Sequence, residues 1–417
     1  MRVAILADFA VPSGGAEKVA LESARALAEA GVDVAYLHAV GEGGDTLLDH
    51  PRIRRVGLGL DDVWAKPAWR GAAEGVWNAE AARALGRALQ ALPGPAPDLV
   101  HLHQWTRSLS PAVLDLLLDR GGPVAVTLHD YFLACPNGVY YRFDRDEPCT
   151  FKPLSGACLA APCDPRSALH KLVRVARSAV TSRLIRRGTL DLVHVSDRSR
   201  AVLEGLLADL PVRHHRVDNP VRAVRRAPAR PGQGEVIAYI GRLTREKGAD
   251  LVAAAAREAG LPALLIGSGP LEAELAAMPG VELLGWQSPE AVADILRTRV
   301  RALAAPSRWL ETGPLTVYEA LAAGVPVVAS ARSGAAEKVV DEVTGFVAEP
   351  TPGALAACFR RLRDPALAAR MGAAAYERYW AAPLDAGLHA RRLIDLYAAM
   401  IAGRAVPLSA ERRIASR

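Results

Sequence analysis

Residues 1–31 read MRVAILADFAVPSGGAEKVALESARALAEAG and contain one strand, one glycine-containing loop and one helix in succession. The apolar run at residues 3–7 predicts a short buried strand. After the turn-forming residues 12–15, small or apolar residues recur at helical spacing until Gly31 ends the pattern, at Val19, Ser23, Leu27 and Ala30. This order is typical of the first strand, loop and helix of a doubly wound α/β domain.

The same order recurs along the whole chain. Short apolar runs predict further strands of the first half at residues 32–37, 99–102, 124–128 and 192–195. A second series of predicted strands lies at residues 236–240, 263–266, 281–284, 302–304 and 325–329. Strands that alternate with helices favour parallel sheets covered on both faces. We therefore predict an α/β protein with two Rossmann-like, doubly wound domains that face each other across a cleft.

A length of 417 residues suits two such domains. We place an N-terminal Rossmann-like domain at residues 1–222 and a linker rich in proline and glycine at residues 223–234. A C-terminal Rossmann-like domain follows at residues 235–380. A last helix at residues 381–404 is expected to pack back toward the N-terminal domain, and residues 405–417 are expected to form a flexible basic tail.

Composition narrows the class of protein. Hydrophobic residues make up 51% of the chain and charged residues 23%, which suits packed cores and not a disordered chain. The net charge of +6 favours anionic partners, but no nucleic-acid-binding motif accompanies it, so we expect none. We find no secretion signal and no apolar run of about 18 residues. The expected location is the cytoplasm, with peripheral attachment to the inner face of the cell membrane as an alternative.

Two glutamates with seven residues between them stand in the segment ETGPLTVYE, residues 311–319. A helix that begins near Leu315 would leave the amides of Leu315 and Thr316 unpaired at its positive end, where they can bind a diphosphate. Pro314 suits the start of that helix. Glu319 lies one turn further along and is expected to face a ribose.

The spacing of Glu311 and Glu319 resembles that of glycosyltransferase family 4, which contains retaining enzymes of GT-B fold. The resemblance covers residues 3–397 approximately. It implies transfer of a sugar from a nucleoside-diphosphate sugar, with Glu311 at the transferred sugar and Glu319 at the ribose hydroxyls. The chain departs from the commoner family pattern in having Gly313 and Pro314 where an aromatic residue and a glycine stand. Because Pro314 has no amide hydrogen, the phosphate contacts are expected to shift to neighbouring amides, with Gly313 in the donor site.

The loop at residues 241–248 follows a predicted strand and carries two cations. Within the resemblance it corresponds to the family's phosphate clamp. Arg242 can bind phosphate oxygens in a bidentate manner, and Lys247 supplies a point charge that offsets the charge of the leaving diphosphate. Gly267 and Trp286 follow later strands and are expected to flank the nucleotide base.

The N-terminal domain supplies the opposite wall of the expected cleft. Gly14 and Gly15 resemble the family's glycine loop, where missing side chains let the backbone approach the donor phosphates. His129 stands at the end of a predicted strand, at the place of the family's cleft histidine, which contacts the sugar near the reacting carbon. Four further residues are expected on the acceptor side: His103, Trp105, Asp130 and Ser196.

Four of the five cysteines lie in an insertion at residues 131–166, namely Cys135, Cys149, Cys158 and Cys163. In a cytoplasmic chain, such a group is more typical of a metal than of disulfides, and a structural zinc held by four thiolates is the simplest hypothesis. Paired C-x-x-C knuckles are missing, so unliganded packing and disulfide bonding stay open as alternatives. We expect no catalytic metal, because the resembled family generally works without one.

Residues 166–187 combine cations with apolar residues in an amphipathic pattern, the cations being Lys171, Arg174, Arg177, Arg183, Arg186 and Arg187. One interpretation is a helix with an apolar face packed and a basic face in solvent. The other is docking on an anionic membrane, which suits a lipid-linked acceptor.

The resemblance thus implies a retaining hexosyltransferase, whose N-terminal domain binds a glycan, lipid-linked or small-molecule acceptor and whose C-terminal domain binds the donor nucleotide, in polysaccharide or glycoconjugate biosynthesis. The alternatives are a GT-B phosphorylase or epimerase, or a module that binds nucleotide sugars without turnover. The transferred sugar, the base, the acceptor and the oligomeric state are left open.

Overall fold

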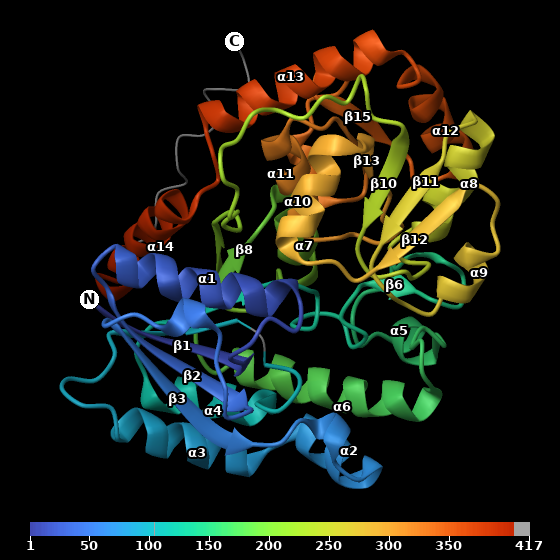
Figure 1. Ribbon diagram of the computed structural model, residues 1–417. Helices are drawn as coiled ribbons and strands as arrows, with labels where there is room; N and C mark the ends of the chain where they lie inside the picture. Colours follow the sequence, from blue (N-terminus) through green and yellow to red (C-terminus); the bar gives the residue numbers. More distant parts are fainter. Residues whose placement is uncertain (104, 404–417) are drawn as a thin grey trace.

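Two parallel sheets organise the computed structural model, which describes residues 1–103 and 105–403 (Figure 1). The predicted tail at residues 405–417 lies outside the described residues. The first sheet has the order β3-β2-β1-β4-β5-β8-β9. Its strands are β1 (Arg2–Phe9), β2 (Asp33–Val40), β3 (Ile53–Leu60), β4 (Leu99–Leu102), β5 (Val124–Leu128), β8 (Leu190–His194) and β9 (Val212–Arg216).

The second sheet has the order β12-β11-β10-β13-β14-β15. Its strands are β10 (Val236–Ile240), β11 (Ala263–Ile266), β12 (Val281–Gly285), β13 (Val300–Ala305), β14 (Val327–Ser330) and β15 (Gly345–Ala348). A two-stranded antiparallel ribbon stands apart from both sheets, with β6 (Tyr141–Arg142) and β7 (Glu147–Pro148). Both large sheets are parallel at every pairing, as two doubly wound domains require.

Helices connect the strands and cover the sheets. The first unit contains α1 (Gly15–Glu29), η1 (Thr46–Leu48), η2 (Val63–Ala65), α2 (Ala68–Val76), α3 (Ala79–Gln90), α4 (Ser110–Arg120), α5 (Gly156–Ala160), α6 (Ala168–Ile185) and α7 (Asp197–Leu206). The second contains α8 (Ala249–Ala259), α9 (Glu272–Ala276), α10 (Pro289–Thr298), α11 (Leu315–Ala323), η3 (Gly334–Lys338), α12 (Pro352–Arg361) and α13 (Pro365–Ala381). The last helix is α14 (Ala386–Ile401).

Each sheet is buried on both faces, which explains its continuous apolar strands. Along β1, Ala4 and Leu6 belong to one core of the first unit, whereas Val3 and Ile5 belong to the core on the other face. The second unit repeats this arrangement with its own pair of cores.

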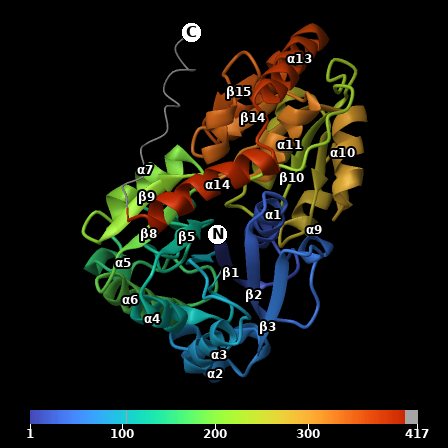
Figure 2. The same cartoon turned by 90° about the vertical axis from the view of Figure 1, so that its left-hand side faces the viewer.

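Helix α14 returns from the second unit to the first and lies beside α1 (Figure 2). Tyr397 is fully buried in the first unit's core, and its hydroxyl lies 2.5 Å from Nδ1 of His101 in β4. His389 Nε2 lies 2.8 Å from the Ser23 hydroxyl of α1. Helix α14 therefore ties the second unit to the first.

Candidate active site

The two units enclose a cavity of about 510 Å³. Its volume lies within the range of small-molecule sites, about 300 to 1,000 Å³. The cavity lies at the carboxyl ends of β5 and β10, the edge where ligands of doubly wound sheets bind. It brings together ten of the predicted site residues: Gly15, His129, Asp130, Lys247, Trp286, Glu311, Gly313, Leu315, Thr316 and Glu319.

The first glutamate is held from two sides. The Lys247 ammonium and the Ser307 hydroxyl each donate to one oxygen of the Glu311 carboxylate, which is buried. The Lys247 ammonium also lies 5.0 Å from the ring centre of Trp309. These contacts fix the carboxylate in place and bring a positive charge to the cavity wall. Ser307 and Trp309 were not predicted from the sequence, because nothing in their spacing distinguishes them from packing residues.

Helix α11 begins at Leu315, as the sequence predicts, and Pro314 precedes it without any side-chain cap. Leu315 and Thr316 line the cavity. The first amides of a helix have no partner within the helix and carry the positive end of its dipole. The start of α11 therefore offers an anion-binding position beside Lys247.

The second glutamate is paired across the cleft. Nζ of Lys18, in the first turns of α1, lies 3.2 Å from Oε1 of Glu319 in α11. Both side chains line the cavity and are only partly exposed. Lys18 was not predicted as a site residue, since its partner lies 301 positions away in the chain.

His129 and Asp130 lie on the opposite wall, at the end of β5. Burial lowers the pKa of His129 to about 3, so this imidazole is neutral at pH 7. Its Nε2 lies 3.2 Å from Nδ1 of His103, whose pKa burial also lowers. Burial raises the pKa of Asp130 to about 6, although the amide of Phe132 donates to it. His129 and Asp130 thus present hydrogen-bonding groups without a permanent positive charge.

A hydrogen bond joins the two walls. The Thr312 hydroxyl donates to the His129 carbonyl oxygen at 2.9 Å, so the glutamate loop contacts the end of β5. Gly334 adds a second contact, because its amide donates to the Glu311 carbonyl at 2.7 Å while its α-carbon faces Ser196 of the first unit.

Six predicted residues take other places among the described residues. The Arg242 side chain is 74% exposed and points away to Glu246, at 3.5 Å, although its neighbour Gly241 lines the cavity. The backbone of Gly267 packs closely against the backbone of Gly241. Its φ of +135° also favours glycine at this position. Three others lie behind the cavity wall: His103 beneath His129, Trp105 in the core, and Ser196 as the buried N-cap of α7. Gly14 is the exposed N-cap of α1.

Two family models match this chain, Glycosyltransferase Family 4 over residues 13–155 and Glycosyl transferases group 1 over residues 221–378. The chain belongs to glycosyltransferase family 4. Among curated relatives of this family member is the D-inositol 3-phosphate glycosyltransferase of Mycobacterium leprae (strain Br4923), 28% identical over 271 residues, which are 60% of this chain and 56% of the relative. That of Mycobacterium tuberculosis (strain F11) is 28% identical over 270 residues, 60% of this chain and 50% of the relative. The chain spans about half the length of the curated relatives it matches.

Solved structures of similar proteins confirm the predicted GT-B fold of this family 4 member. Sucrose-phosphate synthase from Thermosynechococcus elongatus superposes with a TM-score of 0.69 at 18% identity, covering 96% of this chain and 99% of that one. Anabaena Alr3699/HepE, solved in complex with UDP-glucose, gives a TM-score of 0.63 at 17% identity, covering 96% and 100%.

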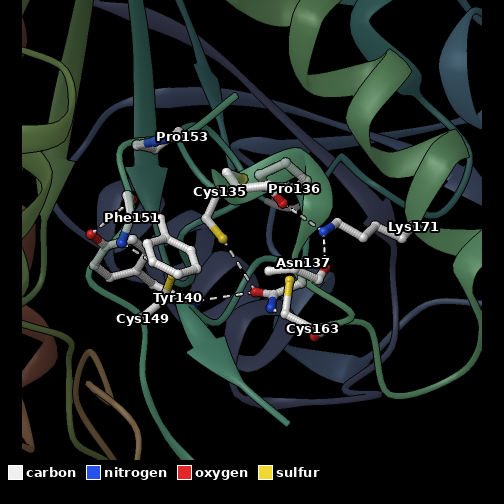
Figure 3. Close-up of a pocket in the computed structure, with 11 residues that line it drawn as sticks. Cys135, Pro136, Asn137, Tyr140, Cys149, Phe151, Pro153, Cys163 and Lys171 are labelled. Atoms are coloured by element: carbon white, nitrogen blue, oxygen red, sulfur yellow. Dashed lines mark hydrogen bonds between the residues drawn. The ribbon is translucent and has the colours of Figure 1, made fainter. Parts of the chain in front are cut away.

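The four cysteines of the family 4 insertion surround one small cavity of about 10 Å³ (Figure 3). Burial raises the pKa of Cys135 to about 12, and its thiol donates to Oδ1 of Asn137 at 3.2 Å. Within residues 1–103 and 105–403 all five cysteines are free thiols. In the same part of the chain, no three His, Cys, Asp or Glu side chains are arranged to hold a metal ion. The predicted zinc site therefore lacks structural support, and the thiols pack as small apolar groups.

The first turns of helix α6 are amphipathic in the sense opposite to the one predicted from its sequence, whereas its last turn buries Leu184 and Ile185 and exposes Arg183, as predicted. Lys171 is buried, and its ammonium donates to the carbonyls of Cys158, Leu159 and Ala161 at the end of α5. Arg174 forms an ion pair with Asp164 at 3.1 Å.

Large apolar side chains occupy the outer face of these first turns instead. Leu169 is 72% exposed and Leu172 is 63% exposed. The insertion explains this orientation, because its free carbonyls and its carboxylate can be satisfied only by inward-facing cations. Separately, no helix in the described part of the chain is long and apolar enough to cross a membrane.

Proposed function

We propose that this family 4 protein transfers a sugar from a nucleoside-diphosphate sugar to a hydroxyl group of an acceptor, with retention of anomeric configuration. One observation carries the proposal: a single cavity holds Glu311, Glu319, Lys247 and the start of α11 on one wall, and His129 on the other. A similar structure has been solved with UDP-glucose bound. The same cavity suits such a donor in volume and charge.

The diphosphate is proposed to bind at the start of α11, beside Lys247. Lys247 stabilises the leaving group through its positive charge, and the amides of Leu315 and Thr316 donate hydrogen bonds to the phosphate oxygens. The exposed side chain of Arg242 swings from Glu246 onto the same phosphates. Glu311, fixed by Lys247 and Ser307, contacts the hydroxyls of the transferred sugar.

In the proposed step the bond between the anomeric carbon and the phosphate oxygen breaks while the acceptor oxygen bonds to the same face of that carbon. The acceptor proton passes to the departing phosphate oxygen, so no protein nucleophile is needed. Neutral His129 can hydrogen-bond the sugar near the reacting carbon without opposing the positive charge that develops there. Asp130 positions an acceptor hydroxyl from the same wall.

Donor binding is tested by thermal denaturation with UDP-glucose, GDP-mannose and ADP-glucose in separate samples. A donor that binds only the folded protein must raise the melting temperature. At a donor concentration 100 times the Kd, the free energy of unfolding increases by about 2.7 kcal/mol. The stabilising donor is then incubated with candidate acceptors, including D-inositol 3-phosphate, for which the curated relatives are named. NMR of the product should show the anomeric configuration of the donor. Inverted product, or no stabilisation by any nucleotide sugar, would refute the proposal.

We also propose that the protein binds the inner face of the cell membrane, where a lipid-linked acceptor would meet the cleft. Leu169, Leu172 and Trp69, the last 76% exposed on α2, support this. Arg183 lies on α6, as Leu169 and Leu172 do, and Arg166 lies just before the start of that helix. Neither arginine forms an ion pair within the described residues. Exposed apolar side chains beside cations are typical of surfaces that bind anionic membranes.

Membrane binding is tested by sedimentation with vesicles of phosphatidylglycerol at low salt. The wild-type protein should sediment with these vesicles, whereas the double variant Leu169→Ser/Leu172→Ser should lose most of the binding. Phosphatidylcholine vesicles serve as the uncharged control. If the wild-type protein stays in the supernatant with anionic vesicles, this part of the proposal is wrong.

A further inference from the structure

A buried carboxylate without a hydrogen-bond partner lies one helical turn behind the cavity. Glu22 of α1 is 1% exposed, and neither of its oxygens has a hydrogen-bond partner within the described residues. Its nearest cation is Arg222, whose Nε lies 3.7 Å from Oε1, too far for a hydrogen bond. A buried carboxylate left in this state is costly, and it would gain free energy from a cation brought into contact.

Lys18 is the cation placed to make that contact. It precedes Glu22 by four positions on the same helix, so the two side chains lie on one face of α1. Its ammonium instead lies 3.2 Å from Glu319 on the other side of the cavity. Glu319 and Glu22 thus compete for one ammonium group, and only the first of them is expected to contact the donor.

We infer that Lys18 is a positioning residue that moves from Glu319 to Glu22 when a nucleotide sugar binds. In the empty cavity Lys18 neutralises Glu319. When the ribose hydroxyls hydrogen-bond to Glu319, the ammonium is released and pairs with Glu22, which offsets the cost of breaking the first pair. This inference rests on the proposed function, in which Glu319 binds the ribose.

The movement of Lys18 toward Glu22 should change the protonation of Glu22. Burial raises the pKa of Glu22 to about 7. The charged groups that act on it are Lys18 of α1, Arg222 after β9, Glu319 of α11 and Asp45 before η1. An ammonium brought into contact lowers the pKa of a carboxyl group, so Glu22 releases its proton to the buffer. Donor binding should therefore release about half a proton at pH 7 and become tighter as the pH rises from 6 to 8.

Calorimetry of the full chain measures this release directly. UDP-glucose, or GDP-mannose or ADP-glucose if one of these is the stabilising donor, is titrated at pH 7 in two buffers of different ionisation enthalpy. The diphosphate of such donors carries no group that titrates near pH 7, so released protons come from the protein. The wild-type protein should release about half a proton, and the variants Glu22→Gln and Lys18→Met should release almost none.

A double-mutant cycle separates movement from a purely structural role. Glu22→Gln should weaken donor binding about tenfold. In this variant Lys18 must still break its ion pair with Glu319, but position 22 no longer offers a carboxylate with which the ammonium can pair. In the Lys18→Met background the same substitution should have no effect on affinity. The control Arg25→Gln removes a partly exposed cation of α1 that pairs with Glu29, and it should change neither affinity nor proton release.

The outcomes distinguish a failure of the inferred Lys18 movement from a failure of the proposed function. Donor binding without proton release, or an equal loss from Glu22→Gln in both backgrounds, would overturn the inference and leave the proposed function standing. If none of the three donors binds, the proposed function and the inference fail together. Melting temperatures of the variants identify any loss of affinity that arises from unfolding.

Discussion

Lys247→Ala is expected to lower kcat by about 10²- to 10³-fold, the usual cost of removing one group that stabilises a developing negative charge. Lys247 is the cation of the second unit that lines the cavity in the described structure, and it lies beside the start of α11. The variant also leaves Glu311 with Ser307 as its remaining side-chain partner. KM for the donor should rise less than kcat falls, because the charge is needed most when the diphosphate departs.

The measurement compares steady-state kcat and KM for Lys247→Ala and Arg245→Ala. Arg245 is the matched control, since it lies in the same loop but pairs with Glu274 at 3.2 Å in solvent. Its loss should change kcat less than twofold, as exposed ion pairs contribute little. Turnover of Lys247→Ala close to the wild-type rate would remove this residue from the proposed mechanism.

Gly334→Ala is expected to have the second largest effect, through geometry instead of charge. Gly334 lies where η3 meets both the glutamate loop and the first unit, and a β-carbon there would collide with the Thr312 carbonyl and the Ser196 side chain. The amide of Gly334 also holds the Glu311 carbonyl at 2.7 Å. The methyl group must therefore displace the loop that carries Glu311 or push the two units apart.

A displacement of about 1 Å at a reacting centre can cost on the order of 10²-fold in rate. We expect that loss in kcat for Gly334→Ala, together with about 1 to 3 kcal/mol of lost stability from overpacking. Gly353→Ala in α12 is the control, because an added methyl group there meets no atom within 4 Å. Urea denaturation and kcat are measured for both variants. If Gly334→Ala kept full activity, the contact between η3 and Ser196 would not set the geometry of the site.

Strands of the sheet interiors were predictable, whereas three edge strands were not. β3, β9 and β15 each lie at an edge of their sheet and were missed. β9 has the sequence VRHHR, in which Arg213 is exposed at the edge while His215 is buried and bonded to Asp191. A central strand of a parallel sheet is apolar on both faces, so it is recognisable in the sequence as a continuous apolar run. An edge strand can carry polar side chains and lacks this pattern.

Local spacing also located the glutamate pair, whose members are eight positions apart, and the start of α11, because both depend on residues close together in the chain. It could not orient α6, since the partners of Lys171 and Arg174 lie in the cysteine-containing insertion. A helical pattern reports two faces and does not say which one is covered.

The sequence by itself therefore determined the class of fold, the two repeated units and the helix start that faces the cavity, because hydrophobic periodicity and helix termini are local properties of the chain. Only the tertiary structure decided that Lys18 pairs with Glu319, that Glu22 is buried without a hydrogen bond, and that Arg242 points away from the cavity. These states depend on charges and on burial contributed by segments far apart in the chain, and such long-range electrostatic and packing energies leave no periodic signal in the order of residues.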